Sequence, residues 1–293
     1  MASAREIQSR MKSIQDTKKI TSAMYMISSS KLKRVRTMLE ATETHFYAIQ
    51  NAIARMLRHF PDMEHPYFGH NVPEKDRKVG YLIVTADKGL AGAYNHNVLK
   101  LAQEEMEKSD IDRLYVVGEI GRHYFEHKKI EIDESFRYTV QNPSIHRARI
   151  IAGRMIALYN SGELDEIHLI YTKMLNSMES EAESYQILPL KKKEYHLDST
   201  VEVPEDIEYL PSADAVLENL VPNYVTGLMY GALVEAYASE QNARMMAMES
   251  ATDSATDMIR ELSIQYNRVR QGAITQEITE VSSGAKAQKK KSR

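Results

Sequence analysis

The stretch YASEQNARMMAMESATDSATDMIRELSIQYNRVRQGAITQEITEVSSGA, residues 237–285, decides how this chain folds. It lies in a segment that has no proline after Pro222, and small or apolar residues return along it about every 3.5 positions, the spacing of a coiled coil. A surface helix of a globular domain would show a wider apolar stripe. A helix over residues 222–284 would be roughly 90 Å long. Because isolated helices are only marginally stable in water, the spacing predicts a partner along its length.

The predicted partner is the other end of the chain. Residues 1–60 contain no glycine or proline, and the same spacing continues through them until Pro61. Residues 1–40 hold nine Lys and Arg against three Asp and Glu, whereas residues 235–284 hold four Arg against eight Asp and Glu. Opposite charges favour pairing, so we expect an antiparallel coiled coil of the N- and C-terminal helices. The alternative is that each helix packs on other parts of a helical domain.

The period of the sequence changes between these helices. Residues 79–85, VGYLIVT, form a short continuous apolar run, which is typical of a strand buried on both faces. Strands and helices then alternate, which predicts a small, mostly parallel, Rossmann-like α/β domain. The expected strands are 79–85, 114–118, a weaker one at 130–136, 167–172 and an edge strand at 185–190; the expected helices are 93–108, 122–127 and 145–160. The predicted organisation is therefore a coiled-coil helix at 1–60, an α/β domain at 76–200, a second coiled-coil helix at 211–284 and a basic tail at 285–293.

Composition excludes several classes of function. The chain has no cysteine, so disulfides, thiolate metal sites and a cysteine nucleophile are excluded. A net charge of −3 argues against nucleic acid as a partner. No apolar run is long enough to span a bilayer. The first residues superficially suit a mitochondrial presequence, but the coiled-coil spacing continues through them, so we interpret them as mature structure.

The turn after the first predicted strand is the candidate for a phosphate site. It reads DKGLAG, residues 87–92, at a position where an open α/β sheet can bind an anion on a helix N-terminus. Its two glycines match neither a dinucleotide fingerprint nor a phosphate loop, and they suit a tight turn. His59, His65 and His70 fit no compact metal site. We therefore predict no catalytic residues, no cofactor and no metal.

Three stretches resemble the gamma subunit of the rotary F-type ATP synthase. They are IQSRMKSIQDTKKITSAMYMISSSKLKR at 7–34, VTADKGLAGAYN at 84–95, and ASEQNARMMAMESATD with YNRVRQGAITQEITEVSSGA at 238–253 and 266–285. The resemblance covers nearly the whole chain. It departs from the family at Lys88 and Ala91, where Arg and Cys are frequent, and in the basic extension at 286–293.

The resemblance implies a non-catalytic rotor shaft in ATP synthesis and ion transport. Such a subunit stands inside a ring of three alpha and three beta subunits, and it meets the epsilon subunit and the membrane ring of c subunits. Ion flow through that ring turns the shaft, and the shaft drives the catalytic beta subunits through their states. The location implied is peripheral, at the cytoplasmic face of a bacterial membrane.

The resemblance also implies positions that contact partners. Met24 and Lys88 correspond to contacts near the beta-subunit levers, and Glu208 and Tyr209 to a segment near the c ring. The contacts on the second helix correspond to Arg244, Gln271, Thr275 and Glu280. The alternative for each is an ordinary solvated or coiled-coil residue; Arg244 and Gln271 are polar in a narrow helix with little core, which favours partner contact.

Helix length points to one further surface. The second helix is predicted to outrun the first by about 15 residues, or roughly 20 Å. Its tip would then have no coiled-coil partner, yet Ile274, Ile278 and Val281 are apolar. Exposure would forfeit roughly 1.5–3 kcal/mol for each, so we expect other subunits to surround them with an apolar sleeve.

Two other functions are compatible with the pattern. A nucleotide-binding α/β protein would use the 87–92 turn, and the isolated chain would then bind nucleotide. A passive coiled-coil tether would need the apolar spacing but not Gln271 or Thr275.

Overall fold

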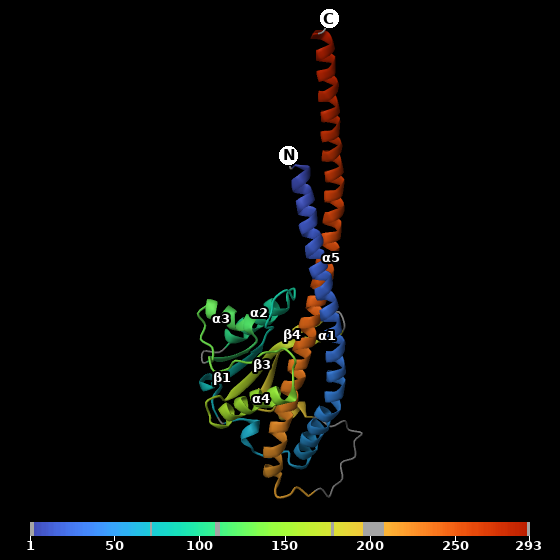
Figure 1. The fold of residues 1–293 in the computed structure, drawn as a ribbon. Coiled ribbons are helices and arrows are strands. Elements are labelled where there is room, and N and C mark those ends of the chain that lie inside the picture. The colour runs from blue at the N-terminus through green and yellow to red at the C-terminus, as the bar shows by residue number, and fades with distance from the viewer. Residues whose placement is uncertain (1–2, 71, 109–111, 177–178, 196–207, 292–293) are drawn as a thin grey trace. The chain divides into compact units, whose positions relative to one another are not determined.

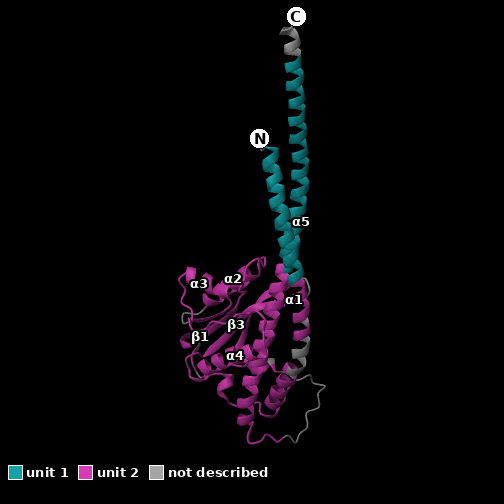
Figure 2. Cartoon of the chain, in the orientation of Figure 1, with its two compact units in different colours: residues 1–27, 245–293 teal, residues 28–244 magenta. Residues whose placement is uncertain are grey.

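The computed structural model describes residues 3–70, 72–108, 112–176, 179–195 and 208–291 (Figure 1). Residues 196–200, at the end of the predicted α/β domain, and residues 292–293 of the predicted tail lie outside them. The chain divides into two compact units, one of residues 1–27 with 245–293 and one of residues 28–244 (Figure 2). Within the described residues, no helix has the length and apolarity needed to cross a membrane.

Two long helices form the first unit, which confirms the predicted coiled coil. Helix α1 spans Ala4–His59 and helix α5 spans Ala213–Lys291; their outer parts lie antiparallel (Figure 2). Ser3 and Glu6 form a reciprocal capping box at the start of α1, since each backbone N–H donates to the other's side chain. The hydroxyls of Thr21 and Thr252 hydrogen-bond across the pair at 2.7 Å. Apolar residues such as Ile7 and Ala255 are buried between the helices.

The outer end of α5 has no cover from this unit. Burial along the helix fades at Val269, and every residue from 270 to 285 is exposed. The expected unpaired tip is therefore present within the described residues. A helix that continues this far without burying a face gains nothing from packing, so its apolar residues need another explanation.

The second unit contains a four-stranded sheet of order β2-β1-β3-β4. The strands are β1 (Val79–Val84), β2 (Asp112–Val117), β3 (Glu166–Met174) and β4 (Ser180–Leu188). Strand β1 pairs parallel with β2 and β3, and β4 is an antiparallel edge. All of β1 is buried, as its continuous apolar run predicts. The mostly parallel α/β fold is thus confirmed.

The strand expected at residues 130–136 is wrong. Ser135 donates its backbone N–H to the Asp133 carboxylate at 2.8 Å, which forms a tight turn in place of a strand. Phe136 is fully buried, and its ring meets the rings of Tyr115 and Tyr138 edge-on. The apolar residues of this segment therefore fill the core from a loop, and the ladder is reduced to one bridge between Val117 and Tyr138.

Helices complete the second unit. They are α2 (Tyr94–Met106), α3 (Glu119–His127) and α4 (Ile145–Asn160), with single 3-10 turns at Pro66–Phe68, Glu74–Asp76 and Lys192–Glu194. Ser144 caps α4 by accepting from the Arg147 backbone N–H. The inner part of α5 packs against the domain, where Leu217, Val225 and Leu233 are fully buried. This stretch of α5 is thus a core helix rather than an exposed shaft.

Gly118 fixes the junction at the carboxyl ends of β1 and β2. Its φ is 97°, and a Cβ there would lie 2.1 Å from the carbonyl oxygen of Thr85. We expect Gly118→Ala to lower the free energy of unfolding by about 2–4 kcal/mol, because left-handed strain adds to steric overlap. Urea denaturation measures the loss. Gly153→Ala in α4 is the control: its Cβ meets nothing within 4 Å, so a small gain is expected. Equal midpoints in the two variants would contradict this account.

Candidate functional site

The 87–92 turn is built by contacts within the domain. The Asp87 carboxylate accepts from the Thr139 hydroxyl and from the backbone N–H groups of Val140 and Gln141, at 3.2 and 3.3 Å. The start of the turn is fixed by Ala86, whose N–H donates to the Asn95 side chain at 2.9 Å. Asp87 is therefore occupied in holding the turn to the loop after Phe136.

Arg244 attaches this turn to helix α5. Its guanidinium donates to the carbonyl oxygens of Lys88 at 2.9 Å and Gly89 at 3.0 Å. It also forms an ion pair with Glu240 at 2.6 Å, one helical turn away. The side chains of Arg244 and Glu240 are only 9% and 4% exposed. Arg244 thus contacts its own chain, and the contact fixes the backbone from which exposed Lys88 projects.

The Arg244 contact places a charged pair inside the domain. Burial raises the pKa of the Glu240 carboxyl, and the Arg244 guanidinium opposes that rise. Burial, with a contribution from Glu240, also raises the pKa of the neighbouring Tyr94 hydroxyl. Ala86, Ala91 and Tyr94 form a small apolar cluster against Ala243 of α5. The apolar cluster and the ion pair together hold the 87–92 turn against helix α5.

The tip of this turn is exposed. Lys88 and Gly89 are exposed, and Leu90 is 65% exposed with a left-handed φ of 63°. Left-handed backbone is costly for a leucine, so the surrounding contacts must hold it there. The turn thus presents an exposed cationic residue and an exposed apolar residue two positions apart in the sequence.

Met24 lies in an apolar stripe of α1 that sequence reasoning missed. It is half-buried, between Ile20 and Ile27, which are 61% and 54% exposed. Positions 20, 24 and 27 share one helix face, whereas Thr21 and Ser28 are buried and Thr21 hydrogen-bonds to Thr252 of α5. The sequence does contain a signal for this stripe, because Ile20, Met24 and Ile27 are spaced by four and then three residues, next to the coiled-coil positions.

The other candidate residues of α5 lie near its C-terminal end. Gln271, Thr275 and Glu280 are exposed. The Thr275 hydroxyl donates to the Gln271 carbonyl at 2.9 Å, and Glu280 accepts from Gln276 at 3.0 Å. Ile274, Ile278 and Val281 are 48%, 64% and 73% exposed. Their spacing places the three on one face, so the tip presents a continuous apolar stripe.

Glu208 and Tyr209 lie just before α5. Glu208 is exposed, whereas the Tyr209 ring meets the rings of Phe60 and His59 edge-on, with centroids 5.5 and 6.1 Å away. Burial raises the pKa of the Tyr209 hydroxyl. The aromatic contacts tie the segment before α5 to the end of α1.

Comparison with known proteins identifies close relatives. Residues 3–288 match the family model described as ATP synthase. The ATP synthase gamma chain of Ruminiclostridium cellulolyticum is 41% identical over 288 residues, covering 97% of this chain and 98% of the relative. That of Acetivibrio thermocellus is 39% identical over 295 residues, covering 99% and 100%. A chain in the central stalk and c-ring structure of Tetrahymena thermophila mitochondrial ATP synthase shares the fold, with a TM-score of 0.60, 22% identity, and coverage of 79% of this chain and 99% of that one.

Proposed function

Because this chain belongs to the family of ATP synthase gamma chains, we propose that it is the rotor shaft that couples ion flow to the cycling of the catalytic beta subunits. One observation carries the proposal. Helix α5 continues beyond its partner, every residue from 270 to 285 is exposed, and three of them form an apolar stripe. Such a tip suits insertion into a ring of other subunits, three alpha and three beta.

The apolar stripe supports a bearing at the tip. Apolar contact is non-directional, so a sleeve around Ile274, Ile278 and Val281 would hold the tip at many angles with similar energy. Directional hydrogen bonds would instead favour particular angles. Gln271 and Thr275 lie beside the stripe, and Glu280 lies on another face of the helix; the three are the candidates for such angle-dependent contacts with the beta subunits.

Coupling requires contacts whose energy changes with angle. A ligand shifts a conformational equilibrium only by its different affinity for the two states, so the shaft must present different faces to each beta subunit. Met24 and Lys88 are our candidates for the lever contacts. Arg244 is buried and bonded to the Lys88 carbonyl, so we assign it the positioning of Lys88 rather than direct contact.

The segment before α5 is the candidate for the opposite end of the shaft. Exposed Glu208 beside the packed Tyr209 suits a contact with the c ring, and the α/β domain suits the epsilon subunit. The chain would then be peripheral, at the cytoplasmic face of a bacterial membrane, and would reach the membrane only through the c ring.

Met24→Lys should impair coupling. A lysine there would place a positive charge in the stripe of Ile20 and Ile27, and could add a charged contact of about 1–3 kcal/mol with an acidic lever at one angle. ATP-driven ion pumping per ATP hydrolysed should fall severalfold in reconstituted vesicles. Met26→Lys is the control, because Met26 is 69% exposed and lies on another face. An unchanged pumping ratio in Met24→Lys would refute the lever contact.

The direct test is a rotation assay. The chain is assembled with alpha and beta subunits, a bead is fixed to the α/β domain, and ATP is supplied. Stepwise rotation in one direction is the expected result. Assembly with hydrolysis but no rotation would leave the passive tether. Failure to assemble, with nucleotide bound by the chain alone, would favour the nucleotide-binding function.

A further inference from the structure

Arg147 reaches back from the first turn of α4 to the chain that precedes this helix. A guanidinium has five N–H donors in a fixed fork, so one side chain can hold several carbonyl groups. The Nη1 group of Arg147 donates to three carbonyl oxygens at 3.1, 2.7 and 3.4 Å, which belong to Thr139, Gln141 and Asn142. Residues 139–142, the 139–142 segment, are thereby attached to α4.

The place of Arg147 within α4 is unfavourable for a cation. It is the third residue of the helix, whose first turn contains no acidic residue. The free N–H groups at a helix N-terminus carry partial positive charge, which repels a cation in the first turn. Arg147 therefore gains nothing from the helix dipole, and the carbonyl oxygens of the 139–142 segment are what compensate its charge.

A single peptide group connects Arg147 to Asp87. The Thr139 carbonyl oxygen accepts from Arg147 at 3.1 Å, and the N–H of the same peptide group, which belongs to Val140, donates to Asp87 at 3.2 Å. This peptide bond is trans, so its C=O and N–H point in opposite directions. A guanidinium and a carboxylate thus bond to opposite sides of one peptide dipole. Hydrogen bonds in such a chain polarise and strengthen one another.

Asp87 directly precedes Lys88, the exposed residue for which a lever contact is proposed above. Its Oδ2 atom accepts three hydrogen bonds from the 139–142 segment. On the other side, Arg244 of α5 donates to the Lys88 carbonyl. The 87–92 turn is therefore attached both to α5 and, through the 139–142 segment, to α4.

We propose that Arg147 is a positioning residue for the Lys88 contact. It acts through the 139–142 segment, which holds Asp87 and with it the backbone from which Lys88 projects. The inference rests on the proposed role of Lys88 and gives this residue a second support beside Arg244. Because Arg244 remains when Arg147 is removed, we expect a looser turn rather than an unfolded domain.

A spin label on the turn measures this support in the purified chain. The chain contains no cysteine, so Leu90→Cys provides a single labelling site at an exposed position of the turn. By EPR, the nitroxide should reorient at least about twofold faster when Arg147→Met is added, because the turn loses one of its two attachments. Arg149→Met is the matched control, since Arg149 is an exposed arginine of the same helix. Equal label mobility in the two variants would overturn the proposal.

Two milder variants separate hydrogen bonding from side-chain bulk. A lysine ammonium has three donors, so Arg147→Lys should give a label mobility between wild type and Arg147→Met. Thr139→Val removes the hydroxyl that donates to Asp87 and leaves Arg147 in place, and it should also raise the mobility. If thermal melting shows that Arg147→Met does not fold, these two variants still test the support. Wild-type mobility in both would contradict it.

Ion pumping separates this inference from the proposed function. The number of ions pumped per ATP hydrolysed is measured in vesicles that hold the assembled complex with unlabelled chain. Arg147→Met should lower this ratio by about twofold or more, and by no further factor when Lys88→Ala is already present, because its effect passes through Lys88. Equal further loss in the Lys88→Ala background would overturn the proposal. If Arg147→Met raises the label mobility but neither variant changes the pumping ratio, the support of the turn stands and the lever contact of Lys88 is contradicted.

Discussion

Replacing Ile274, Ile278 and Val281 together with serine should weaken assembly with the alpha and beta subunits by roughly a thousandfold. Each side chain is about half to three-quarters exposed in this chain, so each would gain about 1–2 kcal/mol on burial in a sleeve. The purified triple variant should unfold at the wild-type urea midpoint. Serine and isoleucine have similar helix propensity, and none of the three residues packs in the core of this chain.

The control for this prediction lies on another face of the same helix. Thr279→Ser with Ser283→Ala changes two exposed polar residues that lie away from the apolar stripe. Titration of labelled chain against the alpha–beta subunits should give nearly wild-type affinity for this pair. Similar losses in both variants would mean that the tip contributes through helix stability. No loss in the triple variant would remove the apolar sleeve from the proposed mechanism.

The long helices could be predicted because their signals are local and repeated. Residues 1–60 contain no glycine or proline, residues 222–284 contain no proline after Pro222, and both segments carry one apolar period throughout. The buried strand β1 was equally clear from its continuous apolar run. The segment 130–136 was not, because a loop that inserts Phe136 into the core has the same apolar content as a weak strand. Only the tertiary position of Phe136 distinguishes the two.

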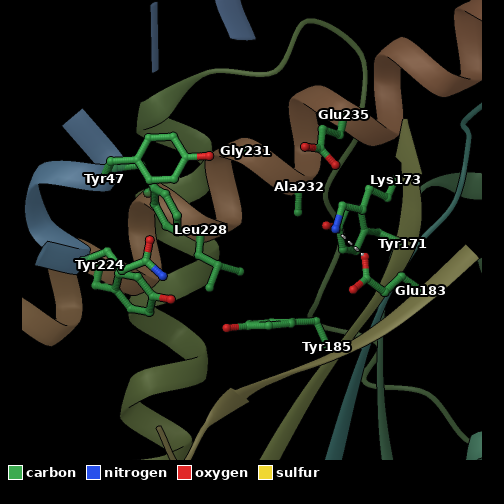
Figure 3. Close-up of a pocket in the computed structure, with 13 residues that line it drawn as sticks. Tyr47, Tyr171, Lys173, Glu183, Tyr185, Tyr224, Leu228, Gly231, Ala232 and Glu235 are labelled. Carbon is green, nitrogen blue, oxygen red and sulfur yellow. Dashed lines mark ion pairs between the residues drawn. The ribbon is translucent and has the colours of Figure 1, made fainter. Parts of the chain in front are cut away.

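In the candidate site, too, one part could be predicted from the sequence and another part could not. The motif resemblance located Lys88 and Arg244, but their hydrogen bond joins residues 156 positions apart, and no local signal predicts it. Arg244 was interpreted as partner-facing because a narrow coiled coil has little core. The structure places it where α5 still packs on the α/β domain, beside buried Glu240 and Asn242. A cavity between α1, β3, β4 and α5 (Figure 3) was missed for the same reason, since its walls come from four elements far apart in the sequence.

Arg244→Met should lower the free energy of unfolding by about 3–5 kcal/mol, the usual cost of removing one partner of a buried ion pair. Methionine keeps much of the side-chain length but leaves Glu240 as a buried carboxylate without its cation. It also removes the donor to the Lys88 and Gly89 carbonyls. The double variant Glu240→Gln with Arg244→Met should recover part of the loss, because no charge then remains buried. Urea denaturation of Arg244→Met, of Glu240→Gln and of the double variant measures the coupling between the two side chains.

The pH dependence of Arg244→Met distinguishes loss of charge compensation from loss of packing. Burial already raises the pKa of Glu240 above its ordinary 4.5, and removing Arg244 removes a cause that lowers it. A raised folded-state pKa means that the folded protein binds the proton more tightly than the unfolded chain does. That stabilisation is present below the unfolded pKa and is lost as the pH rises through the folded pKa. The free energy of unfolding that Arg244→Met loses relative to wild type should therefore be smallest at about pH 5 and should grow toward about pH 8. When Glu240→Gln is already present, the free energy of unfolding lost through Arg244→Met should not vary with pH. If the loss caused by Arg244→Met alone is also constant with pH, the loss arises from packing alone.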